Sequence, residues 1–160
     1  MIRRDTPFLR AVTLAFAFLF VLLPLPDWLS APRPFLLALV IAYWVLETPE
    51  KMGFGRIFLI GILLDLATFS LLGEHALRLL LIAGVLRQLR NRFRFYPVWQ
   101  QSGFLMLILY ADLVLLWLMR NSQAVPMLPA EIGFSPVVAF LVWPWLYIYL
   151  DNVRLKNRSR

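Results

Sequence analysis

Residues 54–72 read FGRIFLIGILLDLATFSLL, an apolar stretch of helical length with a single aspartate, Asp65, near its centre. A carboxylate at that depth in a membrane costs roughly 2.5–3.5 kcal/mol, so it normally faces protein or a polar cavity instead of lipid. The stretch therefore predicts a membrane helix with one buried acid, and the rest of the chain is read outward from it.

Composition places the whole chain in the same class. It has 160 residues, of which 61% are hydrophobic and 16% charged, whereas soluble domains usually carry about a quarter charged residues. The stretches outside the apolar segments are too short for a separate core, so we predict a single membrane domain, residues 1–160. The absence of cysteine excludes disulfides and thiolate zinc sites, and a single histidine, His75, argues against a histidine metal site or a catalytic triad.

Apolar segments before and after residues 54–72 predict an all-α, polytopic bundle of about six transmembrane helices. The expected helices cover residues 8–24, 35–47, 54–72, 75–88, 101–119 and 134–150. The second and fourth are shorter than the ~20 residues that cross a bilayer untilted, so a four-helix membrane topology with these two segments re-entrant is the alternative. The pair Tyr43-Trp44 and the triplet Trp143-Pro144-Trp145 are predicted to lie at the membrane–water interface.

The positive charges predict the orientation. The chain carries 16 Lys and Arg against 9 Asp and Glu, a net charge of +7. In a six-helix topology with both termini inside, only Arg33, Arg78 and Arg120 of the sixteen basic residues fall outside, which leaves thirteen on the inner side. This bias predicts that both termini are cytoplasmic, and it explains the basic balance without nucleic acid.

Four arginines lie at the end of the fourth expected helix and between it and the fifth: Arg87, Arg90, Arg92 and Arg94. Interleaved aromatics would also suit nucleic acid, but this basic segment joins two membrane helices directly. We therefore expect it to anchor the chain at the cytoplasmic surface by contact with anionic lipid headgroups. Docking of a cytoplasmic partner is the alternative.

Three ionisable residues, Asp65, Arg78 and Asp112, lie inside apolar helices. Counted at 1.5 Å per residue, both aspartates lie about 16 Å from the inner ends of their helices. Arg78 enters from the outer side, so an Asp65–Arg78 pair joined by Asp112 is sterically reasonable, although Glu74 could pair with Arg78 locally. The functional interpretation is a proton relay or substrate site. We favour the structural one, in which the charges neutralise one another and fix helix register, because few other polar side chains accompany them.

Gly61, Asp65 and Thr68 recur at helical spacing and share one face of the third expected helix. Small residues let helices approach closely in lipid, so Gly61 and Thr68 are expected to pack inside the chain instead of against a second copy. Neither aspartate has a nucleophile or a second acid nearby in sequence. No enzyme and no cofactor is predicted.

A set of short motifs resembles one known family. The motifs are Arg33-Pro34, Tyr43-Trp44-Val45-Leu46, Pro49, Gly53-x-Gly55, Gly61-x-x-x-Asp65-Leu66 and Ser70-x-Leu72-Gly73-x-x-Ala76-Leu77. In this order they resemble the MreD family of rod shape-determining proteins, and Trp99-Gln100-Gln101 with Trp143-Pro144-Trp145 is similar to its gammaproteobacterial members. Arg78 departs from the pattern, because an apolar or small residue is expected there.

The resemblance implies a non-enzymatic component of the cell-elongation machinery in the bacterial inner membrane. It implies MreC as the partner and, through MreC, the MreB filaments, the glycosyltransferase RodA and a class B transpeptidase. It also implies a fold similar to the substrate-binding subunits of energy-coupling-factor transporters. A scaffold is thus the leading hypothesis, and a small-molecule-binding transport subunit that uses Asp65, Arg78 and Asp112 is the alternative. A transport subunit should have an outward cavity with several polar groups, and the outer loops offer few.

Overall fold

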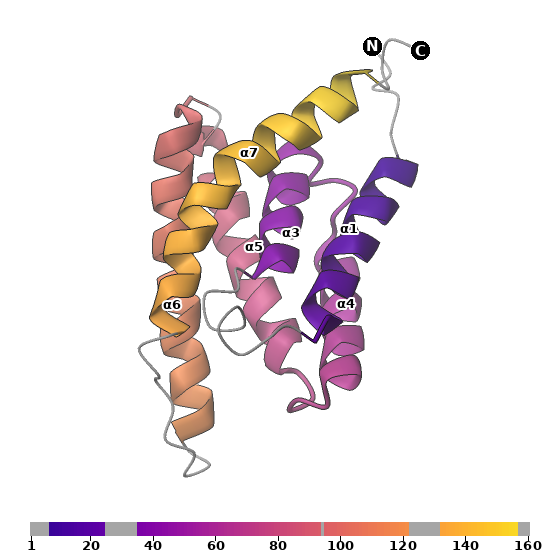
Figure 1. Ribbon diagram of the computed structural model, residues 1–160, viewed down its shortest axis with the longest axis vertical. Helices are drawn as coiled ribbons and strands as arrows, with labels where there is room; N and C mark the ends of the chain where they lie inside the picture. The colour runs from indigo at the N-terminus through magenta and orange to yellow at the C-terminus, as the bar shows by residue number, and fades with distance from the viewer. Residues whose placement is uncertain (1–6, 25–34, 94, 122–131, 157–160) are drawn as a thin grey trace.

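The computed structural model describes residues 7–24, 35–93, 95–121 and 132–156. Within them the chain is all-helical, with six α-helices and no strand, which confirms the predicted all-α class (Figure 1). The elements are α1 (Pro7–Leu22), α3 (Leu36–Glu47), α4 (Phe54–Thr68), α5 (Glu74–Phe93), α6 (Val98–Asn121), the 3-10 turn Ile132–Phe134 and α7 (Ser135–Lys156).

The helices run up and down between two ends of the bundle. The start of α1, the α3–α4 turn, the α5–α6 connection and the end of α7 lie at the upper end in Figure 1. The α4–α5 turn lies at the lower end. Successive helices therefore alternate in direction, as a multi-pass topology requires.

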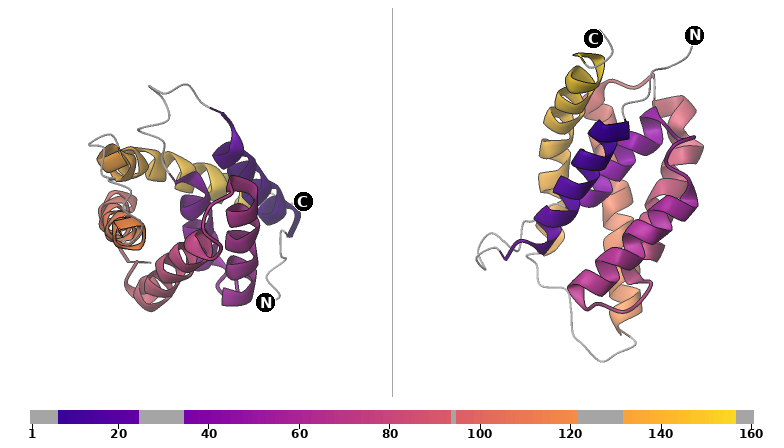
Figure 2. Two further views of the ribbon diagram at one scale, coloured as in Figure 1. Left: turned by 90° about the horizontal axis from the view of Figure 1, so that it is seen from below. Right: turned by 90° about the vertical axis from the view of Figure 1, so that its right-hand side faces the viewer.

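The short helix α3 forms the core. Every residue from Leu37 to Leu46 is buried, and α1, α5 and α7 pack against this helix (Figure 2). A helix that is apolar on all sides is stable only when it is enclosed, which explains its central position. The interfacial placement of Tyr43 and Trp44 is wrong, because both are buried and the Trp44 indole N–H donates to Thr13 Oγ1 of α1 at 3.0 Å.

The second aromatic motif divides between the interior and the surface. Trp143 is fully buried, whereas Trp145 is 80% exposed. Pro144 between them lies inside α7. The prediction of an interfacial belt is therefore wrong for Trp143, and Trp145 faces outward as that prediction requires.

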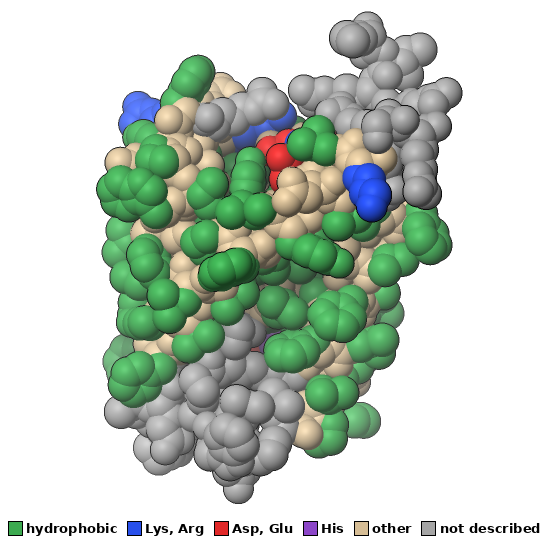
Figure 3. Space-filling view, turned by 45° about the horizontal axis from the view of Figure 1, so that its top comes forward, with side chains coloured by type: hydrophobic (Ala, Val, Ile, Leu, Met, Phe, Trp, Pro, Cys, Tyr) green, Lys and Arg blue, Asp and Glu red, His purple; other side chains and the backbone are tan. Residues whose placement is uncertain are grey.

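The outer faces of the bundle are apolar. Within the described ranges, two helices are long and apolar enough to cross a membrane, Val98–Met119 and Ser135–Lys156, while α1 and α3 are apolar but shorter. Large side chains such as Leu59, Leu107 and Leu141 are about 60% exposed. In Figure 3 apolar side chains cover most of the visible flank, and charged ones gather toward the upper end. Soluble monomers rarely expose apolar surface on this scale, so this surface suits lipid.

Three helix ends differ from the sequence-based expectation by four residues or more, and one of them is the end of α7, which continues from the expected residue 150 to Lys156. The helix expected at 54–72 ends at Thr68, because Phe69 adopts a left-handed conformation with φ 52° and Gly73 follows with φ 97°. The helix expected at 75–88 continues to Phe93. Arg90 and Arg92 are thus helical residues of α5, as Arg87 is, and not part of a loop, and Arg94 lies outside the described residues.

Gly61 sets the distance between α4 and α5. A Cβ built on Gly61 would lie 2.7 Å from the backbone nitrogen and 2.9 Å from the Cβ of Ala76 on α5. The structure thus places Gly61 at a close contact inside the chain. Thr68 lies elsewhere, with its hydroxyl donating to the Leu64 carbonyl at 2.8 Å and lying 3.2 Å from Ser70 Oγ.

Candidate functional site

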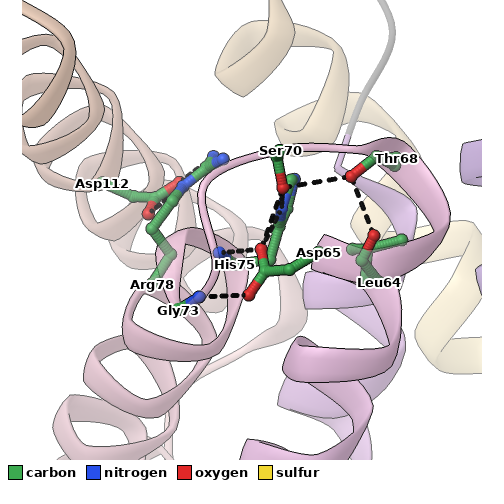
Figure 4. Close-up of polar contacts among 8 residues, drawn as sticks. All are labelled: Leu64, Asp65, Thr68, Ser70, Gly73, His75, Arg78 and Asp112. Carbon is green, nitrogen blue, oxygen red and sulfur yellow. Dashed lines mark hydrogen bonds and ion pairs between the residues drawn. The ribbon is translucent and has the colours of Figure 1, made fainter.

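Asp65 lies in the last turn of α4 and is 1% exposed. Its Oδ2 accepts the backbone N–H of Gly73 at 2.8 Å, and its Oδ1 accepts the backbone N–H of His75 at 2.8 Å. Oδ1 also accepts the Ser70 hydroxyl at 3.0 Å and contacts His75 Nδ1 at 2.8 Å. Figure 4 shows these groups converging on one carboxylate. Asp65 therefore closes the α4–α5 turn.

This arrangement follows from the chemistry of a helix start. The first N–H groups of a helix have no partner within it, and they carry partial positive charge. Asp65 supplies the missing acceptor to His75, the second residue of α5, although it belongs to the preceding helix. Buried charge is tolerated when it is fully hydrogen-bonded, so the turn and the carboxylate stabilise one another.

Asp65, His75 and Ser70 contain the residue types of a catalytic triad but not its geometry. Ser70 Oγ lies 3.2 Å from His75 Nδ1, which is the same nitrogen that faces Asp65. In a working triad the acid and the nucleophile contact opposite nitrogens of the imidazole, so that the ring can relay a proton. This cluster therefore forms a hydrogen-bonded turn and not a proton relay to the serine.

Arg78 and Asp112 form a second buried group, between α5 and α6. Arg78 Nε donates to Asp112 Oδ1 at 2.9 Å and Nη2 donates to Oδ2 at 2.6 Å. The arginine is 7% exposed and the aspartate 6%. The Arg78 guanidinium also lies 5.0 Å from the Phe35 ring centroid. This two-bond geometry is the strongest form of arginine–carboxylate contact and fixes α5 against α6.

The pairing among the three predicted charges is therefore different from the one expected. Arg78 pairs with Asp112, and Asp65 is satisfied by its own turn (Figure 4). The physical reason is the early end of α4, which places Asp65 beside the N–H groups of the turn and of α5. Sequence spacing brought the three charges to a common depth but did not determine how each helix is rotated.

The arginines of the basic segment reach the protein backbone. Arg87 Nη2 donates to the Pro49 carbonyl at 2.9 Å and also to that of Met52, and its guanidinium lies 4.3 Å from the Phe54 ring centroid. Arg90 Nε donates to the Leu46 carbonyl at 2.8 Å. These carbonyls belong to the end of α3 and the turn after it, where acceptors lack helical partners.

Arg92 differs from these two arginines because it is exposed. Contact between the basic segment and lipid headgroups therefore remains a proposal. Among the described arginines of this segment, Arg92 is the one whose side chain is exposed for that contact. Arg87 and Arg90 instead connect α5 to the α3–α4 turn.

Sequence reasoning missed one polar cluster at the upper end. Arg154 on α7 forms an ion pair with Glu47 at the end of α3 and another with Asp151 at 2.8 Å. The Tyr147 hydroxyl donates to Glu47 Oε1 at 3.2 Å. An acid at the end of an apolar helix was the available signal, but Glu47 and Arg154 are too far apart in sequence for a local pattern to pair them.

A groove of about 480 Å³ lies between α5 and α6. Arg78 and Asp112 are the charged residues in its lining, and the remainder is apolar. A smaller hollow of about 130 Å³ lies on α6 beside Gly133. Among the described residues, no group of three His, Cys, Asp or Glu side chains is placed to hold a metal ion.

Fold and site together define an all-helical membrane protein in which Asp65 is satisfied by the groups of its own turn, and Arg78 and Asp112 by each other. The sequence model of the rod shape-determining protein MreD matches residues 2–153. A curated relative, the Rod shape-determining protein MreD of Haemophilus influenzae, is 30% identical over 140 residues, which cover 88% of this chain and 86% of the relative. No solved structure matches the chain.

The chain therefore belongs to the MreD family of rod shape-determining proteins. Its role is in cell shape, and it is a structural component of bacterial membranes, not a member of a known enzyme family.

Proposed function

We propose that the chain is a multi-pass scaffold of the bacterial inner membrane that binds MreC. Through MreC it supports the elongation complex of MreB filaments, RodA and a class B transpeptidase, and hence peptidoglycan synthesis. Six helices cross the membrane in this proposal, in a fold similar to the substrate-binding subunits of energy-coupling-factor transporters. Family membership and the alternating six-helix arrangement support it.

The observation that carries the proposal is how Asp65, Arg78 and Asp112, three of the four buried charged residues in the described part of the chain, are used. The Asp65 carboxylate accepts from two backbone N–H groups and one hydroxyl, and Arg78 and Asp112 satisfy each other through two bonds. Groups committed in this way hold helices in register and are poorly placed to exchange protons or bind solute. A scaffold needs such fixed geometry, because it must present one surface to a partner.

Charge supports the proposed orientation, with the upper end and both termini in the cytoplasm. Most described cations belong to elements that meet at the upper end: Arg10, Lys51, Arg56, Arg87, Arg90, Arg92, Arg154 and Lys156. Arg78, and Arg120 near the end of α6, lie toward the lower end. Basic residues are retained on the cytoplasmic side of bacterial membranes.

The transport-subunit alternative has weaker support. A solute site combines a cavity with several polar groups that converge on it. The described groove between α5 and α6 is apolar except for Arg78 and Asp112, which already bind each other. The scaffold is therefore the function that we carry forward.

Co-purification with MreC in mild detergent tests the proposal. The wild-type chain should form a stable complex, and Asp65→Ala should weaken it by disordering the α4–α5 turn. Ser70→Ala is the matched control, since it removes one of the contacts to Asp65 and leaves both backbone N–H groups bound. A folded wild-type monomer that binds no MreC and retains a small molecule would favour the transport subunit.

A further inference from the structure

The groove between α5 and α6 is open to the surface that we assign to lipid. Leu81 and Val85 on α5 and Leu107 on α6 line it and are each more than 40% exposed. Ala111 lies in the same wall and is exposed, so the groove is recessed at a small residue. An unfilled apolar recess on a membrane protein must take up something apolar, because its walls otherwise lose their contacts.

Polar side chains lie in line with the groove at its upper end. Successive helical residues are rotated by about 100°, so Arg92 lies two turns beyond Val85 on the groove face of α5, about 10 Å further up. By the same rule Gln100 precedes Phe104 by one turn on the groove face of α6. Arg92 is exposed and Gln100 half-buried. A guanidinium and a carboxamide, both hydrogen-bond donors, thus lie on the groove faces of the two helices, beyond the upper residues of its lining.

At the opposite end of the groove, two charged side chains neutralise each other. Arg78 and Asp112 lie there, and each satisfies the other through two bonds. Arg92 is therefore the cation at the groove that is not bound to Asp112. The occupant of the groove should be apolar along its length and anionic at the end that meets Arg92.

We propose that this groove binds an anionic phospholipid, with one acyl chain along Val85, Leu107 and Ala111 and the phosphate on Arg92 and Gln100. Guanidinium binds phosphate oxygens through paired hydrogen bonds, and amide N–H groups add a further donor. The acyl chain supplies the apolar length that the groove requires. Under the proposed orientation, the bound lipid belongs to the cytoplasmic leaflet.

Native mass spectrometry of the detergent-purified chain tests this site. Phosphatidylglycerol and phosphatidylcholine with identical acyl chains are titrated against the wild type, Arg92→Gln and Arg56→Gln. Arg56 is the matched control, because it is an exposed cation near the same end of the bundle but on α4. A third variant, Ala111→Phe, fills the groove.

The wild type should retain phosphatidylglycerol about tenfold better than phosphatidylcholine, the scale of one charge-assisted hydrogen-bonded contact. Arg92→Gln should remove that preference while Arg56→Gln keeps it, and Ala111→Phe should lower retention of both lipids. Equal losses in the two arginine variants would overturn the site in favour of diffuse headgroup attraction. A folded Ala111→Phe variant with unchanged lipid retention would also overturn it, as would a partner helix, in place of lipid, in the groove of the purified wild type.

Discussion

Asp65 holds His75 by two contacts from one oxygen: Oδ1 accepts the His75 backbone N–H at 2.8 Å and faces its Nδ1 at 2.8 Å. The two residues lie on different helices, so this relationship fixes where α4 ends and where α5 begins. Asp65, a carboxylate that is costly to bury in a membrane, is thus the acceptor that holds the α4–α5 hairpin together.

Removing this acceptor should destabilise the chain. Asp65→Ala leaves the part-buried N–H groups of Gly73 and His75 without their acceptor. The cost should be about 2–6 kcal/mol, since each unsatisfied group costs roughly 1–3 kcal/mol. Ser70→Ala should cost about 0.5–1.5 kcal/mol, the value of one ordinary hydrogen bond. Thermal unfolding in detergent followed by size exclusion gives the ranking. Equal losses for the two variants would contradict the role assigned to the carboxylate.

The Arg78–Asp112 pair should behave as a unit. Arg78→Leu or Asp112→Leu alone leaves one uncompensated buried charge and should cost about 3–5 kcal/mol. The double variant Arg78→Leu/Asp112→Leu should recover most of that stability, because an apolar pair replaces the ion pair. The same unfolding assay, arranged as a double-mutant cycle, measures the coupling. Additive losses would mean that the two residues do not depend on each other.

Gly61 should tolerate no side chain. Gly61→Ala places a Cβ against the Ala76 backbone and should cost about 1–3 kcal/mol through overpacking. Gly55→Ala is the control on the same helix, since a Cβ there meets no atom within 4 Å and alanine favours helix. Its stability should be unchanged or slightly higher. A neutral Gly61→Ala variant would show that the two helices can separate at this point without loss.

Substitutions of the arginines in the basic segment should differ in their effect on stability. Arg90→Gln loses the bond to the Leu46 carbonyl and should cost about 1–3 kcal/mol. Arg92→Gln, at an exposed position, should change stability by less than about 0.5 kcal/mol. Unfolding measurements on both variants in detergent decide. If Arg92→Gln were the more damaging, the assignment of Arg90 to the end of α3 would be wrong.

The sequence predicted the helical class and the three interior charges, because each rests on composition along one segment. It predicted a short apolar helix at 35–47 but not that this helix, α3, forms the core. It did not predict the pairing of Arg78 with Asp112, since a pair depends on the rotation of two helices about their axes. The end of α4 was also misplaced, because residues 69–72 are apolar apart from Ser70. Only Ser70 and Gly73 indicated a turn, and this turn has a positive φ at Phe69 and Gly73.

The sequence also did not predict the long-range polar contacts. Arg87 and Arg90 were assigned to headgroups because charge patterning cannot distinguish lipid phosphate from the free carbonyls at a helix end. The Glu47–Arg154 ion pair joins α3 to the last turn of α7, and no local pattern links positions so distant in the chain. Both kinds of contact become visible only when the helices are packed.

The most direct test of the scaffold account is MreC recovery and cell shape with the Arg78→Leu/Asp112→Leu double variant, expressed in cells that lack the wild-type chain. The account predicts rod-shaped cells and near-normal co-purification of MreC, because the buried charges serve the architecture and an apolar pair can replace them. A double variant that is folded, inserted and present at normal levels, yet gives round cells, would contradict the account and assign the charges a chemical role.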